Sequence, residues 1–440
     1  MKTFLAIICT IFCAFLGRAQ EGFSTFPEKN KVILPFKLVN NLVIIPVSVN
    51  GVELSFLLDS GVEETILFSL DEKDEVPLYD VEKITLRGLG NQEGVEGLKS
   101  KNNTLELGGL GFKHQEILIV IDELMNLSSS LGMPVNGIIG YQFFRDYLVK
   151  INYARKKLVI YNRAKTNIGK LTKDYTPLDI TIERNKPYVI SSVKTGDDQI
   201  NAKLLLDTGN SDAIWLFDKK SDKINIPERN FDDFLGRGFS GPVFGKKARI
   251  TDFKLDDFHF TRPVVSFPDT VSLRNVKMVD DRLGSIGGEV LKRFHVILDY
   301  KNSKFYLRKN ANFDLPFHCN TSGIELHHVG LKMVQEKKQR NGTSSSVKIE
   351  FSSGNEMDIK YQFELKPVYE IASVRKGSPA DVVGIKQGDV LLTINNSQSY
   401  RYTLEEINEM LKSDDGRKLL LEVQRDNTIL KFKLEMKSVL

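Results

Sequence analysis

The segments FLLDSG (residues 56–61) and LLLDTG (residues 204–209) decide the fold of this chain. In each segment a run of apolar residues, typical of a buried strand, ends in an aspartate, a small hydroxylated residue and a glycine. The glycine allows the chain to turn sharply directly after the strand. The two aspartates, Asp59 and Asp207, are 148 positions apart, so the same local pattern occurs twice in one chain.

A second pair of matching segments lies at almost the same separation. GIIGYQFFRDYLVKINYARKKLVIY (residues 137–161) resembles GSIGGEVLKRFHVILDYKNSKFYLR (residues 284–308). The aligned glycines, Gly140 and Gly287, are 147 positions apart, and an aligned pair of tyrosines has the same separation. Landmarks that share one separation indicate an internal repeat with units of about 140 residues, a size typical of a single domain.

Strand patterns dominate each repeat. Each one opens with β-rich runs (residues 42–49 and 188–193) and closes with a glycine, a short helical stretch and two strands joined by a basic turn. We therefore expect a mostly β fold of two tandem lobes related by a pseudo-twofold axis.

The repeated aspartates predict a pair of neighbouring carboxyl groups. If a pseudo-twofold axis brings Asp59 and Asp207 together, repulsion between like charges separates their pKa values, so one group keeps a proton. The ionised carboxylate can take a proton from a bound water while the protonated one donates to a carbonyl oxygen. This is amide hydrolysis without a covalent intermediate. A single Asp-Gly at a strand end would be explained more simply as a turn cap. The catalytic interpretation therefore depends on the occurrence of two matching motifs in one chain.

These motifs resemble those of aspartic proteases. Asp-Ser/Thr-Gly after an apolar strand, followed later by an apolar-apolar-Gly element, is similar to one lobe of that family. Two such lobes in one chain resemble the bilobal pepsin-like enzymes and tandem retropepsin-like proteins, over about residues 32–310. The resemblance implies that Asp59 and Asp207 are catalytic. It also implies that six residues hold the active-site loops: Ser60, Gly61, Thr208, Gly209, Gly140 and Gly287.

The sequence departs from the family pattern at three places. The first motif continues as Val62-Glu63-Glu64, the second as Asn210-Ser211-Asp212, and Ser285 replaces an apolar residue of the second supporting element. Glutamates close to the aspartates would raise their proton affinity, so the sequence allows either a working pH nearer neutral or a degenerate site.

Mobile hairpins that cover a cleft are expected between each aspartate and its supporting glycine. Two glycine-rich segments, residues 87–97 and 236–245, are the candidates. Within the second, Gly-Phe-Ser-Gly-Pro also resembles the nucleophile turn of a serine protease, with His114 or His259 as the base. That alternative leaves the repeat unexplained.

The last part of the chain follows a different pattern. The sequence GSPA at 377–380, followed by Gly384-Ile385, Gly388-Asp389 and Ile394-Asn395, resembles a PDZ domain, an α+β module that binds peptide ends by strand addition. The resemblance implies peptide binding by the loop residues Ser322, Gly323 and Ile324, with residues 331–366 as an insertion. A helix is expected at 403–411, where a threonine cap precedes an acidic first turn.

The first residues predict export. Lys2, an apolar run at 4–16 and the small residues Gly17 and Ala19 form a secretory signal with cleavage before Gln20. We expect a periplasmic, cell-surface or extracellular protein. The expected organisation is a signal peptide (1–19), a first protease-like lobe (20–165), a second protease-like lobe (166–312) and a PDZ domain (313–440).

Composition limits the partners. The 61 basic and 57 acidic residues give a net charge of +4, too small a surplus to indicate a nucleic-acid partner. After signal cleavage no apolar run is long enough for a membrane span, and Cys319 is the one remaining cysteine. The histidines show no metal-binding spacing, so we expect no metal and no cofactor. The expected partners are a peptide or unfolded protein substrate and a protein C-terminus at the PDZ domain. The alternative function is a catalytically inactive, peptide-binding pseudoprotease and PDZ scaffold.

Overall fold

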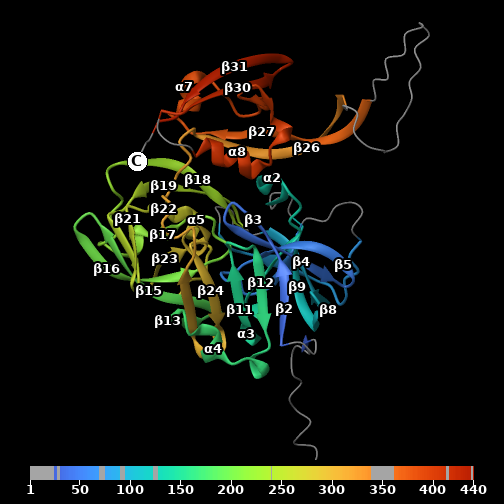
Figure 1. Cartoon of the computed structure of the whole chain (residues 1–440), viewed down its shortest axis with the longest axis vertical. Helices are drawn as coiled ribbons and strands as arrows, with labels where there is room; N and C mark the ends of the chain where they lie inside the picture. The colour runs from blue at the N-terminus through green and yellow to red at the C-terminus, as the bar shows by residue number, and fades with distance from the viewer. Residues whose placement is uncertain are drawn as a thin grey trace, which may run out of the picture. The chain divides into compact units, whose positions relative to one another are not determined.

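A computed structural model describes residues 24–26, 30–68, 75–89, 95–121, 127–238, 240–337, 361–412, 416–437 and 440 (Figure 1). The predicted signal peptide, residues 1–19, lies outside the described residues. The chain forms two compact units. The described residues of the first unit lie within 1–125, 135–228 and 234–315, and those of the second unit lie within 126–134, 229–233 and 316–440.

Each repeat builds one large sheet of the first unit. The sheet of the first repeat contains, in the described residues, β1 (Ser24–Thr25), β3 (Lys37–Val39), β4 (Leu42–Val49), β5 (Val52–Leu58), β6 (Thr65–Leu67), β7 (Glu82–Leu86), β8 (Val95–Leu107), β9 (Leu110–Val120) and β10 (Gly137–Ile139). The sheet of the second repeat contains, again within the described residues, β14 (Thr181–Glu183), β15 (Lys186–Thr195), β16 (Asp198–Leu206), β17 (Ile214–Leu216), β18 (Asn230–Gly238), β19 (Gly241–Arg249), β20 (Asp252–Leu255), β21 (Phe258–Thr261), β22 (Val264–Pro268) and β23 (Arg282–Ile286).

The two sheets repeat the same central pairings. β10 pairs in parallel with β5 and antiparallel with β6, while β23 pairs in parallel with β16 and antiparallel with β17. β5 and β16 each end in three consecutive buried residues, because the apolar runs before the aspartates are covered on both faces.

A third sheet joins the repeats, and Figure 1 shows several of its strands side by side. Its described strands, in spatial order, are β13 (Thr176–Asp179), β25 (Lys304–Lys309), β24 (Phe294–Asp299), β11 (Leu148–Asn152), β12 (Lys157–Tyr161) and β2 (Lys31–Pro35). The antiparallel pairing of β11 with β24 is centred on Lys150 and Ile297, which are 147 positions apart. Each strand therefore pairs with its own repeat counterpart in a symmetrical register. A twofold relation between the lobes would produce this register, although the pseudo-twofold arrangement itself stays a prediction.

Helices are short in the first unit. Those described are α3 (Tyr141–Asp146), α4 (Ile168–Thr172), α5 (Thr270–Leu273), α6 (Gly288–Leu291) and the 3-10 turns η2 (Arg163–Lys165), η3 (Asp218–Lys220) and η4 (Tyr300–Asn302). α3 and α6 are the short helices expected after Gly140 and Gly287. In the part of the chain that the structure describes, no helix is long and apolar enough to cross a membrane.

The second unit is built on another sheet. Its described strands are β26 (Ile324–Lys337), β27 (Tyr361–Val374), β28 (Val390–Ile394), β29 (Ser397–Gln398), β30 (Lys418–Arg425) and β31 (Thr428–Glu435). Its helices are α2 (Leu127–Leu131), α7 (Pro379–Val383), α8 (Leu404–Leu411) and the 3-10 turn η5 (Ser399–Arg401). The helix expected at 403–411 is confirmed, because Thr403 caps α8 and forms a capping box with Glu406. The predicted mostly β class is also confirmed.

The segment 331–366, expected to be an insertion, begins and ends in strands. β26 continues through residue 337 and β27 begins at residue 361, so the two ends of this segment pair with each other. Apolar and polar residues alternate along both strands here, a pattern typical of β-strands. Leu331 and Met333 of β26 pair with Pro367 and Leu365 of β27. The loop-like stretches within 338–360 lie outside the described residues.

Candidate active site

Backbone hydrogen bonds fix both aspartates at the ends of their strands. The N–H of Asp59 donates to the carbonyl oxygen of Ile139 at 3.0 Å, and the N–H of Asp207 donates to that of Ile286 at 2.9 Å. The acceptor in each case is the residue directly before the predicted supporting glycine. The backbone of each aspartate is thus held by the end of a parallel neighbouring strand.

The two supporting glycines lie against the loops that follow the aspartates. A Cβ added at Gly140 would overlap the carbonyl oxygen of Val62, and one added at Gly287 would overlap that of Asp212. The N–H of Tyr141 donates to the same Val62 oxygen at 3.0 Å. Any side chain at either glycine would therefore displace an aspartate loop.

Ser60 and Thr208 join the two loops reciprocally. The N–H of Ser60 donates to Oγ1 of Thr208, and the N–H of Thr208 donates to Oγ of Ser60, both at 3.0 Å. Each hydroxyl then donates across the repeat boundary: Ser60 to the carbonyl oxygen of Leu206 at 2.6 Å, and Thr208 to that of Leu58 at 2.8 Å. Both side chains are buried, so these four bonds are shielded from water.

Gly61 and Gly209 bring the carboxyl groups together. The N–H of Gly61 donates to Oδ1 of Asp59 at 2.7 Å, and the N–H of Gly209 donates to Oδ1 of Asp207 at 3.1 Å. A Cβ added at Gly61 would lie 2.9 Å from Oδ1 of Asp207, and one added at Gly209 would overlap the Asp59 carboxyl group. Each glycine thus contacts the aspartate of the other repeat, and the absence of a side chain lets the two carboxyl groups approach.

The surroundings favour a single proton on this pair. Burial, and next the Asp207 carboxylate, raise the pKa of Asp59 to about 8. Burial also raises the pKa of Asp207, while the cationic groups of Arg282 and Lys186 act in the opposite direction. The hydrogen bond between the two carboxyl groups raises the pKa of Asp59 and lowers that of Asp207, and Arg282 also lowers that of Asp207, so we assign the shared proton to Asp59.

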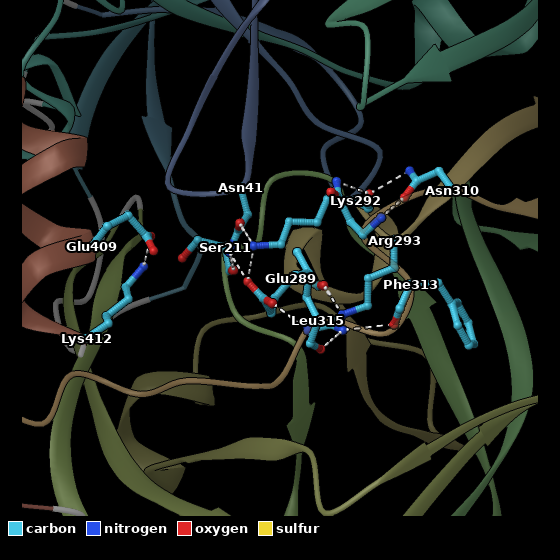
Figure 2. A network of polar contacts seen from close by, with 11 residues as sticks. Asn41, Ser211, Glu289, Lys292, Arg293, Asn310, Phe313, Leu315, Glu409 and Lys412 are labelled. Atoms are coloured by element: carbon cyan, nitrogen blue, oxygen red, sulfur yellow. Dashed lines mark hydrogen bonds and ion pairs between the residues drawn. The ribbon is translucent and has the colours of Figure 1, made fainter. Parts of the chain in front are cut away.

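The turn at Asn41 reaches from the first repeat to the loop after Asp207, as Figure 2 shows. Nδ2 of Asn41 donates to the carbonyl oxygen of Ser211 at 2.8 Å and to Oε2 of Glu289 at 2.9 Å. Nζ of Lys292 donates to Oδ1 of Asn41 at 2.9 Å. The amide is therefore bonded on both sides, which fixes its orientation.

A matching turn in the second repeat reaches back to the first. Nδ2 of Asn185 donates to Oε1 of Glu63 at 2.5 Å, four residues after Asp59. Asn41 and Asn185 both have positive φ angles, 66° and 61°. Sequence reasoning missed both; the available signal was an asparagine at a tight turn between two strands, where positive φ is favoured. Glu63 therefore accepts a hydrogen bond that joins the loop after Asp59 to the second repeat.

The serine-protease alternative does not fit the contacts. Oγ of Ser240 accepts a hydrogen bond from the N–H of Gly88 at 3.2 Å, and this side chain is fully buried. His114 pairs with Asn102, and His259 pairs with Asp252.

Ser240 instead links the two candidate flap segments. Its N–H donates to the carbonyl oxygen of Leu89 at 2.8 Å, so the β18–β19 hairpin contacts the segment that follows β7. Residues 90–94 and 239 lie outside the described residues.

Trp215 and Cys319 are both buried in the protein interior. Trp215 is buried in an apolar cluster with Phe217, Leu235 and Val243, and its Nε1 donates to Asp212. Cys319 is buried and forms no disulfide. No group of three or more metal-ligating side chains occurs within the described ranges.

The predicted peptide-binding loop of the second unit is engaged internally. The N–H of Gly323 donates to Oδ1 of Asn320 at 3.1 Å, and the N–H of Ile324 donates to Oγ of Ser322 at 3.0 Å. The N–H of Ser322 donates to the carbonyl oxygen of Leu411 at 3.4 Å. In this conformation the three N–H groups face intramolecular acceptors, so capture of a carboxylate by this loop stays a prediction.

Comparison with protein-family models gives two matches. A model described as aspartyl protease matches residues 45–143, which include Asp59, Ser60, Gly61 and Gly140. A model described as PDZ domain matches residues 370–425, from β27 to the end of β30. The chain therefore contains an aspartyl protease domain and a PDZ domain.

Proposed function

We propose that this protein is an exported aspartic endopeptidase in which Asp59 and Asp207 activate one water molecule. The observation that carries the proposal is the reciprocal Ser60–Thr208 network, which holds the buried Asp59 carboxyl group beside the half-buried carboxyl group of Asp207. The second aspartate comes from the part of the chain outside the matched protease domain, and the same local bonding surrounds it.

The assigned proton positions support a complete acid–base cycle. The ionised Asp207 takes a proton from water while the oxygen of that water bonds to the peptide carbonyl carbon. Asp59 donates its proton to the carbonyl oxygen, giving a neutral diol. Asp207 then returns its proton to the leaving nitrogen as the C–N bond breaks, and Asp59 recovers a proton from the diol. The aspartates end in their starting states, and no covalent enzyme intermediate forms.

The PDZ domain supports a peptide or unfolded protein as the substrate class, because such domains bind peptides in extended form. We propose that it recruits substrate C-termini or regulates access to the aspartates. The predicted signal peptide supports export.

Casein digestion tests this proposal directly. We expect the wild-type protein to release peptides from casein, and a statine-type inhibitor, whose hydroxyl mimics the diol, to block the release. The measurement is peptide release by mass spectrometry with and without inhibitor. Binding of casein peptides without any cleavage would instead favour the pseudoprotease scaffold.

A further inference from the structure

The sheet of the second unit has an edge that suits peptide binding. β26 is the terminal strand on one side of the described sheet, and α8 packs against it. Domains of the PDZ type bind a peptide by adding it as a strand to such an edge. The edge beside α8 is therefore the expected peptide groove.

Backbone groups along β26 identify the side that faces this groove. The N–H of Ile324 donates to Oγ of Ser322, and its carbonyl oxygen accepts from Nδ2 of Asn320 at 2.7 Å. These groups are thus directed away from the partner strand β27. His328 lies four positions further along the same strand, beyond a register shift between Glu325 and Leu326, and its carbonyl oxygen accepts a hydrogen bond from outside the sheet.

A short segment of this unit already contacts that edge. Oγ of Ser129, in α2, donates to the carbonyl oxygen of His328 at 2.6 Å. One residue after α2, Gly132 has φ +67°, and a Cβ added there would lie 2.8 Å from Cβ of Leu404, the first residue of α8. Residues 127–132 therefore contact β26 through α2 and approach the start of α8 at Gly132; Figure 1 draws α2 next to β26.

We propose that residues 127–132 are an internal occupant of the PDZ groove, which an external peptide with a free C-terminal carboxylate must displace. The proposal rests on peptide binding by the PDZ domain and is independent of cleavage. Apparent affinity for an external peptide falls in proportion to the fraction of molecules whose groove is open. In the sequence, this segment lies between β9 and β10, and β10 ends at Ile139, whose carbonyl oxygen holds the N–H of Asp59. Displacement of residues 127–132 from the groove would therefore move a part of the chain that is close in sequence to the active site.

Expulsion of the segment should increase peptide affinity. The experiment uses the full-length chain carrying Asp59→Asn, so that no probe is cleaved. The probe is a fluorescein-labelled pool of random octapeptides with free C-terminal carboxylates, and an amidated pool serves as the reference. We expect Gly132→Val, whose side chain collides with Leu404, to bind the carboxylate pool about tenfold more tightly or better, measured by fluorescence polarisation. Ser129→Ala, which removes one hydrogen bond, should give a smaller gain in the same direction.

The matched control is Gly196→Val. Gly196 has a similar φ of +61°, but a Cβ there meets nothing within 4 Å, so this variant has the backbone strain without the collision. Hydrogen exchange of the amides in 324–330 reports whether the segment has left the groove, and it should accelerate only in the Gly132 and Ser129 variants. Faster exchange without a gain in affinity would overturn the proposal, and so would unchanged exchange in a folded Gly132→Val protein.

Discussion

Replacement of Asp59 by asparagine is expected to abolish cleavage and, at neutral pH, to make the protein more stable. Asparagine has nearly the same shape and can still accept the hydrogen bond from Gly61, but it cannot act as an acid. General acid–base groups typically contribute 100- to 10,000-fold to a rate, so we expect a loss of about 1,000-fold or more. Asp207→Asn should cause a comparable loss, because it removes the base.

The stability effect follows from the raised pKa of Asp59. Its pKa is about 8 in the folded protein, above the ordinary value of 3.8, so the folded state binds a proton that the unfolded state has released. Stability is therefore lost as pH rises from about 4 towards 8. Asparagine removes this dependence, and we expect a gain on the order of a few kcal/mol near pH 7 that vanishes near pH 4.

Thermal unfolding from pH 4 to pH 8 measures this difference. The exposed Asp257→Asn serves as the control, with wild-type stability and activity expected. Retained cleavage in the Asp59→Asn protein would contradict a catalytic function of this carboxyl group. Lower stability at every pH would contradict its raised pKa.

Replacement of Thr208 by valine should cause the largest loss of stability. Valine conserves the shape but removes the hydroxyl, so the N–H of Ser60 and the carbonyl oxygen of Leu58 lose their partner in a buried site. Each buried unpaired group costs about 1–3 kcal/mol, so we expect a loss of about 2–6 kcal/mol in the free energy of unfolding. Cleavage should fall as well, because the two loops are no longer held together.

Thr208→Ser is the matched control. It keeps the hydroxyl and reproduces the residue that the first repeat carries at the corresponding position, Ser60. We expect near wild-type stability and activity. Chemical denaturation of both variants measures the two contributions. A valine variant as stable as the wild type, with a destabilised serine variant, would show that the methyl group rather than the hydrogen bonds is important at this site.

The sequence predicted correctly those features that depend on residues adjacent in the chain. An aspartate at the end of an apolar strand, followed by a hydroxyl and a glycine, predicts a buried strand end and a tight turn, and the structure has both at Asp59 and Asp207. The Thr403 cap likewise predicted the start of α8, because capping depends on residues within one turn.

Contacts between distant segments were not predictable in the same way. Asn41 bonds to Ser211, which is 170 positions away, and no local pattern in the sequence encodes that pairing. Arg282 lies at the start of β23, and its effect on Asp207 depends on strand register. The membership of residues 126–134 in the second unit also depends on tertiary packing alone.

The rate of casein cleavage from pH 3 to pH 10 is the most direct test of the central claim that Asp59 and Asp207 act as one singly protonated pair. The active form needs a proton on Asp59 and a charge on Asp207. Because the pKa of Asp59 is about 8, we expect a bell-shaped profile that is high near neutral pH and falls above about pH 8. A rate that continues to rise beyond pH 9, or that depends on a single ionisation, would contradict the account.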